Sequence, residues 1–354
     1  MTDKHKKKIV ILAAGSLDAF TAKTAAGIVR YRPDEVVGVL DPSHAGERLE
    51  ELLGVGEGIP IVSSLDKLDH LHPDTLVIGV ATPGGRLPDE WRPILRGALE
   101  RRMQIVNGLH TMLGENAELA ELAARNGATI WDVRRPPEDL SVGMARAAQV
   151  NGHTVLTVGS DCNVGKKIVA IELSRELTSR GQDAVFVPTG QTGVMIAGRG
   201  IAIDRVIADF VSGAVEQIVM EQRDHDWIVI EGQGGIFHPA YSGVTLGLMH
   251  GACAGAMILC HQPTRSCLRH TQIPIPSLKE LIAVHETLMR PVRPSRVVAI
   301  ALNCLDLSEA DATQAVYRAE QECQLPATDV VRFGAGPLAD ALVNHFVRTA
   351  QPTS

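Results

Sequence analysis

The chain has 354 residues, of which 45% are hydrophobic and 21% charged, a balance that excludes a disordered or collagen-like protein. At about 150 residues per domain this length predicts two domains, each large enough to bury a core without disulfides or a structural metal. A formal charge of -7 and an aromatic content of 3% are unlike a nucleic-acid-binding protein, so we expect no nucleic-acid partner.

The cysteines and the long uncharged stretch are both consistent with a cytoplasmic protein, which is the location we expect. The six cysteines are scattered without a CxxC pair, as reduced cytoplasmic thiols are. Residues 232–264 contain no Asp, Glu, Lys or Arg, but they include His238, Pro239, His250 and several glycines. These residues are unsuited to a helix in lipid, so we expect a buried domain interior and no membrane partner.

The first part of the chain alternates short apolar runs with helical periodicity. Strands are predicted at 7–15 (KKIVILAAG), 35–41 (EVVGVLD), 75–81 (TLVIGVA) and 104–108 (QIVNG), and helices at 91–103 and 116–126. This order predicts a Rossmann-like α/β domain over residues 1–138. The first turn lacks G-x-G-x-x-G, so we expect no NAD there, although Asp41 ends the second strand.

The two prolines of RRPPED, residues 134–139, interrupt the periodicity and predict a linker. A second α/β domain is expected over residues 139–354. Its predicted strands are 153–159 (HTVLTVG), 183–189 (DAVFVPT), 227–232 (WIVIEG), 256–261 (AMILCH) and 297–303 (VVAIALN). Ligands of parallel sheets bind beyond the carboxyl ends of the strands, so the residues that follow these runs are the candidate site.

A glycine-rich turn joins the 153–159 strand to an amphipathic helix, which is the context of a P-loop. Its backbone amides and the helix N-terminus would hold phosphate oxygens, and Lys166 would add positive charge. The candidate cofactor-binding residues of this turn are Gly159, Ser160, Asp161, Cys162, Asn163, Val164, Gly165, Lys166 and Lys167.

Two departures from the common P-loop pattern bear on the cofactor. Five residues separate Gly159 from Gly165 where four are usual, a spacing that with Asp161 resembles dethiobiotin synthetase. Lys167 replaces the Ser or Thr that would bind magnesium. A phosphate-bearing cofactor that is held and not hydrolysed, such as coenzyme A, therefore fits better than ATP with magnesium, and we expect no metal.

Three motifs in order carry a family resemblance: GSDCNVGKK at 159–167, PTGQTGVMIAGRGIAIDRVIADFVSGAVEQ at 188–217 and EGQGGIFHPAYSGVTLGLMHG at 231–251. With them, nearly the whole chain resembles the DgcN-type D-glutamate N-acetyltransferases, formerly a family of unknown function. The resemblance implies acetyl transfer from acetyl-CoA to the amine of D-glutamate, and an enolase-like enzyme that acts on the product. We also expect a homo-oligomer, a dimer. The alternatives are an ATP-dependent ligase of the dethiobiotin synthetase type and a non-catalytic, nucleotide-responsive partner protein.

Amine acetylation needs a group that accepts the ammonium proton. Glu231, at the end of a buried strand, is the first candidate, because partial burial raises a carboxyl pKa. His238 and Tyr241 in the next segment are alternatives. Asp204 and Asp209 are further candidates in a stretch expected to be helical from about Ile203, where their spacing places them on different faces.

Substrate-binding candidates come from three further segments. Gln191 and Thr192 lie between glycines in a predicted loop, and Gln233 follows Glu231 closely. Arg265 could grip a dicarboxylate with two hydrogen bonds, in competition with Arg199 and Arg205 or with a plain ion pair. Asn303 ends a strand where, by resemblance to dethiobiotin synthetase, it would contact the adenine of coenzyme A.

Overall fold

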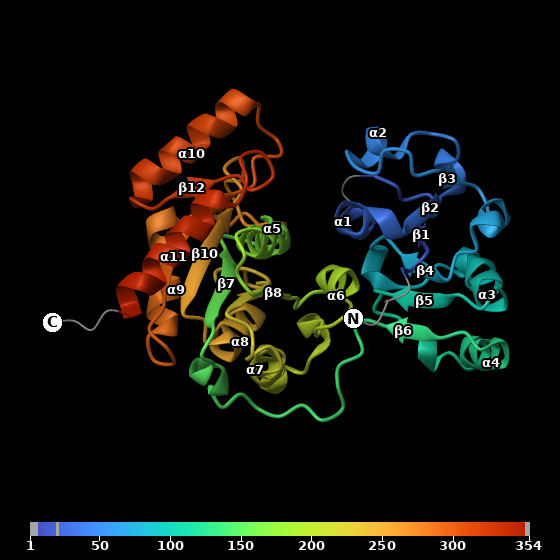
Figure 1. Ribbon diagram of the computed structural model, residues 1–354, viewed down its shortest axis with the longest axis horizontal. Coiled ribbons are helices and arrows are strands. Elements are labelled where there is room, and N and C mark those ends of the chain that lie inside the picture. Colours follow the sequence, from blue (N-terminus) through green and yellow to red (C-terminus); the bar gives the residue numbers. More distant parts are fainter. Residues whose placement is uncertain (1–5, 19–20, 351–354) are drawn as a thin grey trace. The chain divides into compact units, whose positions relative to one another are not determined.

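The chain forms two compact α/β units in a computed structural model that describes residues 6–18 and 21–350 (Figure 1). Residues 1–135 together with 194–199 make the first unit, and residues 136–193 with 200–354 make the second. Each unit contains one parallel six-stranded sheet. The expected fold class, two successive parallel-sheet domains, is confirmed.

The first sheet has the strand order β3-β2-β1-β4-β5-β6. Its strands are β1 (Ile9–Leu12), β2 (Val36–Leu40), β3 (Ile61–Val62), β4 (Thr75–Ile78), β5 (Gln104–Asn107) and β6 (Ile130–Asp132). The four strands predicted from apolar runs are present. The edge strands β3 and β6 were not predicted, because two or three residues are too few to show a period.

The helices of the first unit are α1 (Lys23–Tyr31), α2 (Leu49–Leu53), α3 (Arg92–Glu100) and α4 (Ala117–Asn126). Helix α4 begins where the Asn116 side chain accepts a hydrogen bond from the backbone of Leu119, and it ends at Gly127. Asp41 follows β2 directly, and its buried carboxylate accepts the backbone N–H of Ser43 at 2.9 Å. That bond holds the turn after the strand.

The second sheet has the strand order β12-β11-β10-β7-β9-β8. Its strands are β7 (His153–Gly159), β8 (Ala184–Val187), β9 (Trp227–Ile230), β10 (Ala256–His261), β11 (Arg296–Leu302) and β12 (Ala327–Thr328). All the strands predicted for this half are found, and the short β12 is an addition. Because β7, β8, β9 and β10 run parallel, the residues that follow them meet at one edge of the sheet.

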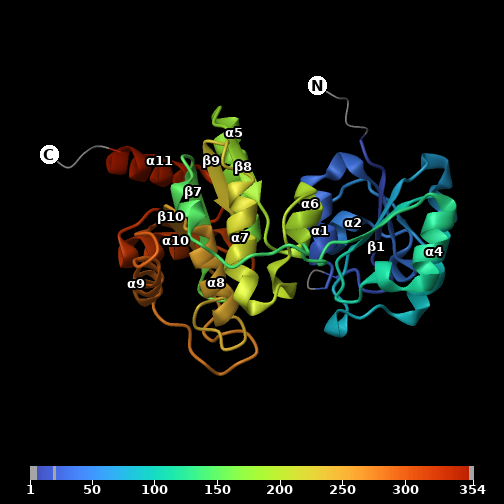
Figure 2. The same ribbon diagram turned by 90° about the horizontal axis from the view of Figure 1, so that it is seen from below.

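Helices cover both faces of the second sheet. They are α5 (Lys166–Ser179), α7 (Val211–Met220), α8 (Ser242–Ala252), α9 (Leu278–Met289), α10 (Glu309–Cys323) and α11 (Gly336–Ala350). Helix α6 (Gln191–Ala197) begins in the second unit, but its residues from 194 onward belong to the first. Side chains of β9 alternate between two cores: Trp227 and Val229 pack with α5 and α11, whereas Ile228 and Ile230 pack with α7, α8 and α9. Figure 2 shows α5 and α11 on one side of the strands and α8, α9 and α10 on the other.

Two local predictions were wrong. The stretch after Ile203 is not one helix but two 3₁₀ turns, Ile203–Arg205 and Ala208–Phe210, because Val206 between them is extended. Asp204 and Asp209 are therefore exposed residues of separate turns and share no helix. The predicted loop that contains Gln191 and Thr192 is instead the start of α6.

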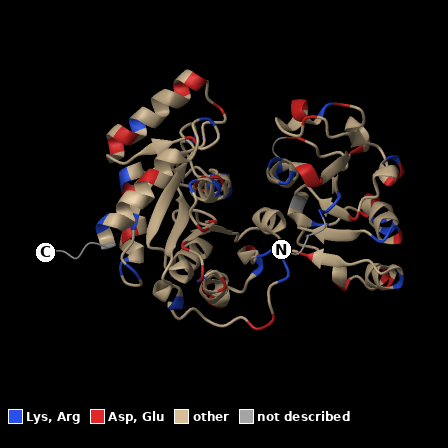
Figure 3. Cartoon of the chain, in the orientation of Figure 1, with Lys and Arg blue, Asp and Glu red and all other residues tan. Residues whose placement is uncertain are grey.

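The strands are nearly uncharged, and the acidic and basic residues lie mainly on helices and loops, with both signs intermixed (Figure 3). Among the described residues, no helix combines the length and the apolarity needed to cross a membrane.

Candidate functional site

The loop between β7 and α5 has unused backbone donors. Asn163 and Gly165 have left-handed backbone angles, with φ of 55° and 103°. Within the described part of the chain, the backbone N–H groups of Asn163, Val164 and Gly165 have no hydrogen-bond acceptor. Helix α5 begins directly afterwards, so its positive N-terminal end faces the same place. The loop can thus bind an anion with several oxygens, such as a phosphate group.

Lys166 lies beneath this loop and is only 6% exposed. Its Nζ donates to the carbonyl oxygens of Asp161 at 2.7 Å and Gly234 at 2.6 Å. Burial lowers the pKa of the ammonium group. Because an ammonium group has three N–H bonds, one donor is left for a ligand. Lys166 therefore stabilises the loop in addition to supplying charge.

Asp161 is a buried residue that organises the loop from within. One carboxylate oxygen accepts from the backbone of Cys162 at 2.7 Å. The other accepts from the backbone of Arg269 at 2.7 Å and from Nη1 of Arg265 at 2.9 Å. Burial alone would raise the pKa of Asp161, but these hydrogen bonds and the charge of Arg265 hold it below its usual value.

Arg265 has both terminal nitrogens in use within the protein. Besides the Asp161 contact, Nη1 donates to the carbonyl of Cys162 at 2.7 Å, and Nη2 donates to Oε1 of Gln262 at 2.6 Å. The sequence left open whether Arg265 binds a substrate carboxylate or forms an ion pair within the protein, and the structure has the ion pair. The guanidinium holds the P-loop in place.

Glu231 follows β9 at the same edge of the sheet and is 4% exposed. Its Oε2 accepts the backbone N–H groups of Thr189 at 3.2 Å and Gly190 at 3.3 Å. Burial raises the pKa of Glu231, opposed chiefly by the charge of Lys167 and by these hydrogen bonds. A carboxylate with a raised pKa beside a phosphate-binding loop is suited to accept a proton.

Glycines make room for this carboxylate. A Cβ atom on Gly193 would lie 2.3 Å from Oε2 of Glu231, and one on Gly190 would lie 2.7 Å from Nε2 of Gln233. The glycines of the GQTG segment therefore have a steric function: they let α6 begin close to Glu231. Gln191 and Thr192, the first residues of α6, lie between these two glycines.

Thr189 belongs to this site, although its sequence position alone did not mark it as a site residue. Its hydroxyl donates to the carbonyl of Glu231 at 2.6 Å and accepts from Nε2 of Gln233 at 3.2 Å. The backbone N–H of Ile203 donates to the Thr189 carbonyl at 3.0 Å, which brings the turn that contains Asp204 near it. The available signal was its position as the last residue of the predicted strand 183–189.

His238 is buried, and both of its ring nitrogens contact the backbone. Nε2 lies 2.9 Å from the carbonyl of Arg269, and Nδ1 lies 3.1 Å from the N–H of Ala240. The first partner can only accept and the second can only donate, so these bonds require a neutral ring with its proton on Nε2. Tyr241 packs against this ring with centroids 4.5 Å apart and is 39% exposed.

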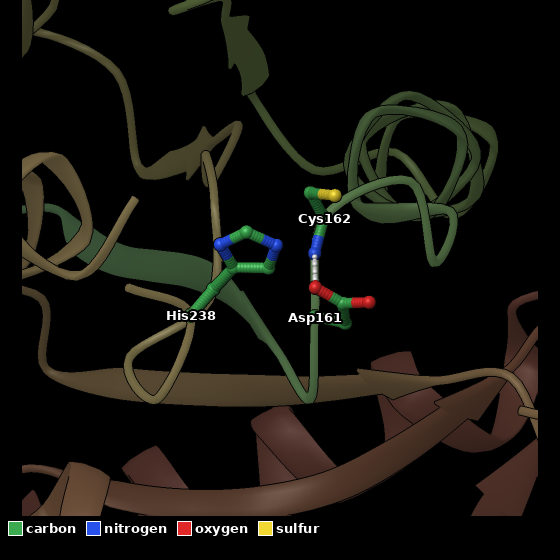
Figure 4. A group of neighbouring side chains, drawn as sticks. All are labelled: Asp161, Cys162 and His238. Atoms are coloured by element: carbon green, nitrogen blue, oxygen red, sulfur yellow. Dashed lines mark hydrogen bonds between the residues drawn. The ribbon is translucent and has the colours of Figure 1, made fainter. Parts of the chain in front are cut away.

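Asp161, Cys162 and His238 have ligand atoms within 4.8 Å of one another (Figure 4). Their donor set fits a metal ion poorly. Each carboxylate oxygen of Asp161 already has a donor, and both nitrogens of His238 are in use. Burial also raises the pKa of the Cys162 thiol, which disfavours the thiolate that a metal requires. We assign no metal to this group.

Asn303 follows β11 and adjoins the P-loop. A Cβ atom on Gly165 would lie 3.7 Å from the Cβ of Asn303. The Oδ1 of Asn303 accepts from the backbone of Leu305 at 3.3 Å, which leaves the side-chain NH₂ group for a ligand. A wide cavity of about 680 Å³ elsewhere in this unit, between α9, α11 and the start of β11, contains none of the predicted site residues.

Known proteins resemble the chain along most of its length. Residues 42–136 match a Rossmann-like domain of unknown function, DUF1611_N, and residues 141–339 match the P-loop domain DUF1611_C. A D-glutamate N-acetyltransferase from Tritonibacter scottomollicae is 39% identical over 92% of this chain and 95% of its own. Another D-glutamate N-acetyltransferase, from Pseudoalteromonas sp, is 32% identical over 93% of this chain and 96% of its own.

A solved structure matches the fold as a whole. A DUF1611 family protein from Anabaena variabilis is 38% identical, covers 96% of this chain and 99% of its own, and has a TM-score of 0.90. The resemblance that the three sequence motifs carry is thus confirmed, and this chain belongs to the DUF1611 family.

Proposed function

We propose that this protein transfers an acetyl group from acetyl-CoA to the amine of D-glutamate and releases N-acetyl-D-glutamate. The names of the two curated relatives support the reaction and its acceptor. The observation in the structure that carries the proposal is the position of Glu231. This buried carboxylate with a raised pKa lies at the same sheet edge as a phosphate-binding loop.

The residues of the loop fit a phosphate-bearing donor. The free N–H groups of Asn163, Val164 and Gly165 and the N-terminus of α5 would hold phosphate oxygens of coenzyme A. Lys166 would contribute its remaining N–H, and Asn303 would contact the adenine. When bound, the cofactor supplies an acetyl thioester, which a neutral amine can attack.

In the proposed reaction Glu231 removes the proton that makes the substrate amine an ammonium ion. The carboxylate keeps backbone hydrogen bonds from Thr189 and Gly190, which orient it before the substrate arrives. We propose that Gln191, Thr192 and Gln233 contact D-glutamate. Gln233 lies within hydrogen-bond distance of Glu231, and Gln191 and Thr192 lie between the two glycines that adjoin its carboxylate.

Other candidates for the acid-base role have weaker support. His238 would have to break a backbone hydrogen bond before it could accept a proton. Asp204 and Asp209 are exposed side chains in two separate 3₁₀ turns, and the described hydrogen bonds of the Glu231 carboxylate do not come from either turn. Tyr241 is the candidate to return a proton to the departing thiolate.

The test is to incubate the protein with D-glutamate and either acetyl-CoA or ATP with magnesium. Acetyl transfer predicts free thiol and N-acetyl-D-glutamate from the first mixture and no ADP from the second. ADP formation that depends on an amino acid would overturn the proposal in favour of a ligase. If neither product formed under any condition, a non-catalytic, nucleotide-responsive protein would be favoured. L-glutamate is the control for stereochemistry, and we expect it to react more slowly.

Three further proposals come from the sequence and the family resemblance: a cytoplasmic location, a homodimer, and a metabolic link to an enolase-like enzyme that consumes N-acetyl-D-glutamate. Sedimentation of the purified protein tests the second, with twice the chain mass of 37.9 kDa as the expected result.

A further inference from the structure

His261 is the last residue of β10 and lies beside the P-loop. Its Nδ1 is 2.9 Å from the hydroxyl oxygen of Ser160. Backbone bonds fix both residues: the N–H of Ser160 donates to the carbonyl of Cys260 at 2.9 Å, and the N–H of Asn303 donates to the carbonyl of His261 at 2.8 Å. The imidazole is therefore held between the phosphate-binding loop and the strand that ends at Asn303.

The surroundings of Ser160 determine which ring nitrogen of His261 carries the proton. Ser160 is 0% exposed, and among the described residues its hydroxyl has no hydrogen-bond partner other than His261. A buried hydroxyl proton without an acceptor is costly, so the hydroxyl donates to Nδ1. An imidazole that accepts at Nδ1 has its own proton on Nε2.

The other side of the ring is available to a ligand. Within the described residues Nε2 of His261 has no hydrogen-bond partner, and it is not one of the polar atoms sealed from solvent. Burial and the positive charge of Arg265 lower the pKa of His261 to about 4. The ring is consequently neutral at physiological pH and presents one N–H donor.

The register between β10 and β7 determines where His261 lies relative to the P-loop. Cys260 pairs with Gly159 across β10 and β7, so His261 stands level with Ser160, where the loop leaves the sheet. The free N–H groups of the loop are only a few residues further along the chain. A neutral donor here adds a hydrogen bond to an anion without the desolvation cost of a third charge next to Lys166 and Lys167.

We propose that His261 donates a hydrogen bond from Nε2 to a phosphate oxygen of the coenzyme A held by the P-loop, and that Ser160 is a positioning residue that fixes its tautomer. The identity of the ligand rests on the proposed function. The hydrogen bond itself is a property of this chain, and it can be measured without turnover.

Two amide variants of His261 distinguish the proposed Nε2 donor from the Nδ1 atom that contacts Ser160. The side-chain NH₂ of His261→Asn lies near the position of Nδ1, whereas that of His261→Gln extends to the position of Nε2. Calorimetry should show that His261→Asn weakens binding of coenzyme A and of pyrophosphate by about 10- to 100-fold, the value of a hydrogen bond to a charged group. His261→Gln should retain most of the affinity. Equal affinities of the two variants for coenzyme A would overturn the proposal.

Controls separate a local effect from general damage. Binding of pantetheine, which lacks phosphate, should not depend on residue 261. His225→Ala is the matched control, since this imidazole also bonds through Nδ1, to Asp183 at 2.8 Å, but lies before β9 at the other end of the sheet. If the Asn variant fails to fold, ¹⁵N NMR of the unsubstituted protein decides, because a proton on Nδ1 of His261 would contradict the proposal.

The outcome is independent of the proposed reaction. If coenzyme A binding depends on His261 but no thiol is released with D-glutamate, the inference stands and the function fails. If thiol is released while His261→Asn binds coenzyme A normally, the function stands and the inference fails.

Discussion

Asp161 of the P-loop forms an ion pair with Arg265, with Oδ2 and Nη1 separated by 2.9 Å and the carboxylate side chain fully buried. This pair connects the loop to the segment that follows β10. Arg265, which the sequence offered as a substrate-binding residue, thus fixes the conformation of the P-loop.

Arg265→Ala should reduce the free energy of unfolding by about 1.5–3 kcal/mol, because a buried carboxylate loses a charged donor. Urea denaturation measures this change. The control is Arg296→Ala, which removes an ion pair to Glu286 whose arginine is 73% exposed and should cost less than about 1 kcal/mol. Equal losses in both variants would show that the Asp161 pair has no special structural role.

Lys166→Met should weaken coenzyme A binding by about 10- to 100-fold, since a charge-assisted hydrogen bond is lost. It should also lower thermal stability, because the carbonyls of Asp161 and Gly234 lose their donor. Calorimetry with coenzyme A and with D-glutamate distinguishes the two ligands. Unchanged coenzyme A affinity would mean that the loop is not the cofactor site.

Acetyl transfer should continue in EDTA, because Lys167 occupies the position of the magnesium-binding hydroxyl. Lys167→Ser removes a charge that lowers the pKa of Glu231, so the acid limb of the kcat profile should move to higher pH. Thiol release measured across pH tests both statements. Complete inhibition of the unsubstituted protein by EDTA would contradict the prediction of metal-independent transfer. An acid limb that does not move in Lys167→Ser would contradict the predicted effect of Lys167 on the pKa of Glu231.

His238→Ala should destabilise the protein by about 1–3 kcal/mol, since Arg269 and Ala240 lose a buried partner. The acid limb of kcat/KM should stay where it is, because the proposed base is Glu231. Loss of that limb in the variant would transfer the base from Glu231 to His238.

Much of the architecture could be predicted because long apolar strands and the P-loop spacing are local signals. Contacts across the sheet edge leave no such signal. The sequence alone offered Arg265 a role with substrate or with a surface partner, and it did not indicate that Asp161, about a hundred positions earlier, would be its partner. The roles of Thr189 and Ser160 could not be predicted for the same reason: their partners, Glu231 and His261, lie on other strands that the sheet brings next to them.

The turns at Asp204 and Asp209 show the limit of periodicity. One helix was expected from about Ile203, but the chain is not helical at Val206 and Ile207. The backbone of Ile203 bonds to Thr189 and fixes where the first turn lies. This tertiary contact overrides local helix propensity.

Glu231→Gln is the substitution that tests the mechanism most directly. The amide keeps the size of the carboxylate and can still accept from Thr189 and Gly190, but it cannot take up the ammonium proton. We expect kcat at neutral pH to fall by about 10²- to 10⁴-fold. The rate should partly recover at high pH, where more of the substrate amine arrives neutral. A near-normal kcat at neutral pH would exclude Glu231 as the base.

The same variant should gain stability while it loses activity. Burial raises the pKa of Glu231 in the folded protein above the ordinary 4.5, so the folded state holds this proton more tightly than the unfolded state does. The contribution of Glu231 to stability is then complete below about pH 4.5 and is lost as the pH rises through the folded-state pKa. Since Gln has no proton to lose, the melting temperature of Glu231→Gln should exceed that of the unsubstituted protein by a margin that grows with pH from 4.5 and then levels off. Scanning calorimetry at several pH values measures this margin, and a variant less stable at every pH would show that Glu231 is chiefly structural.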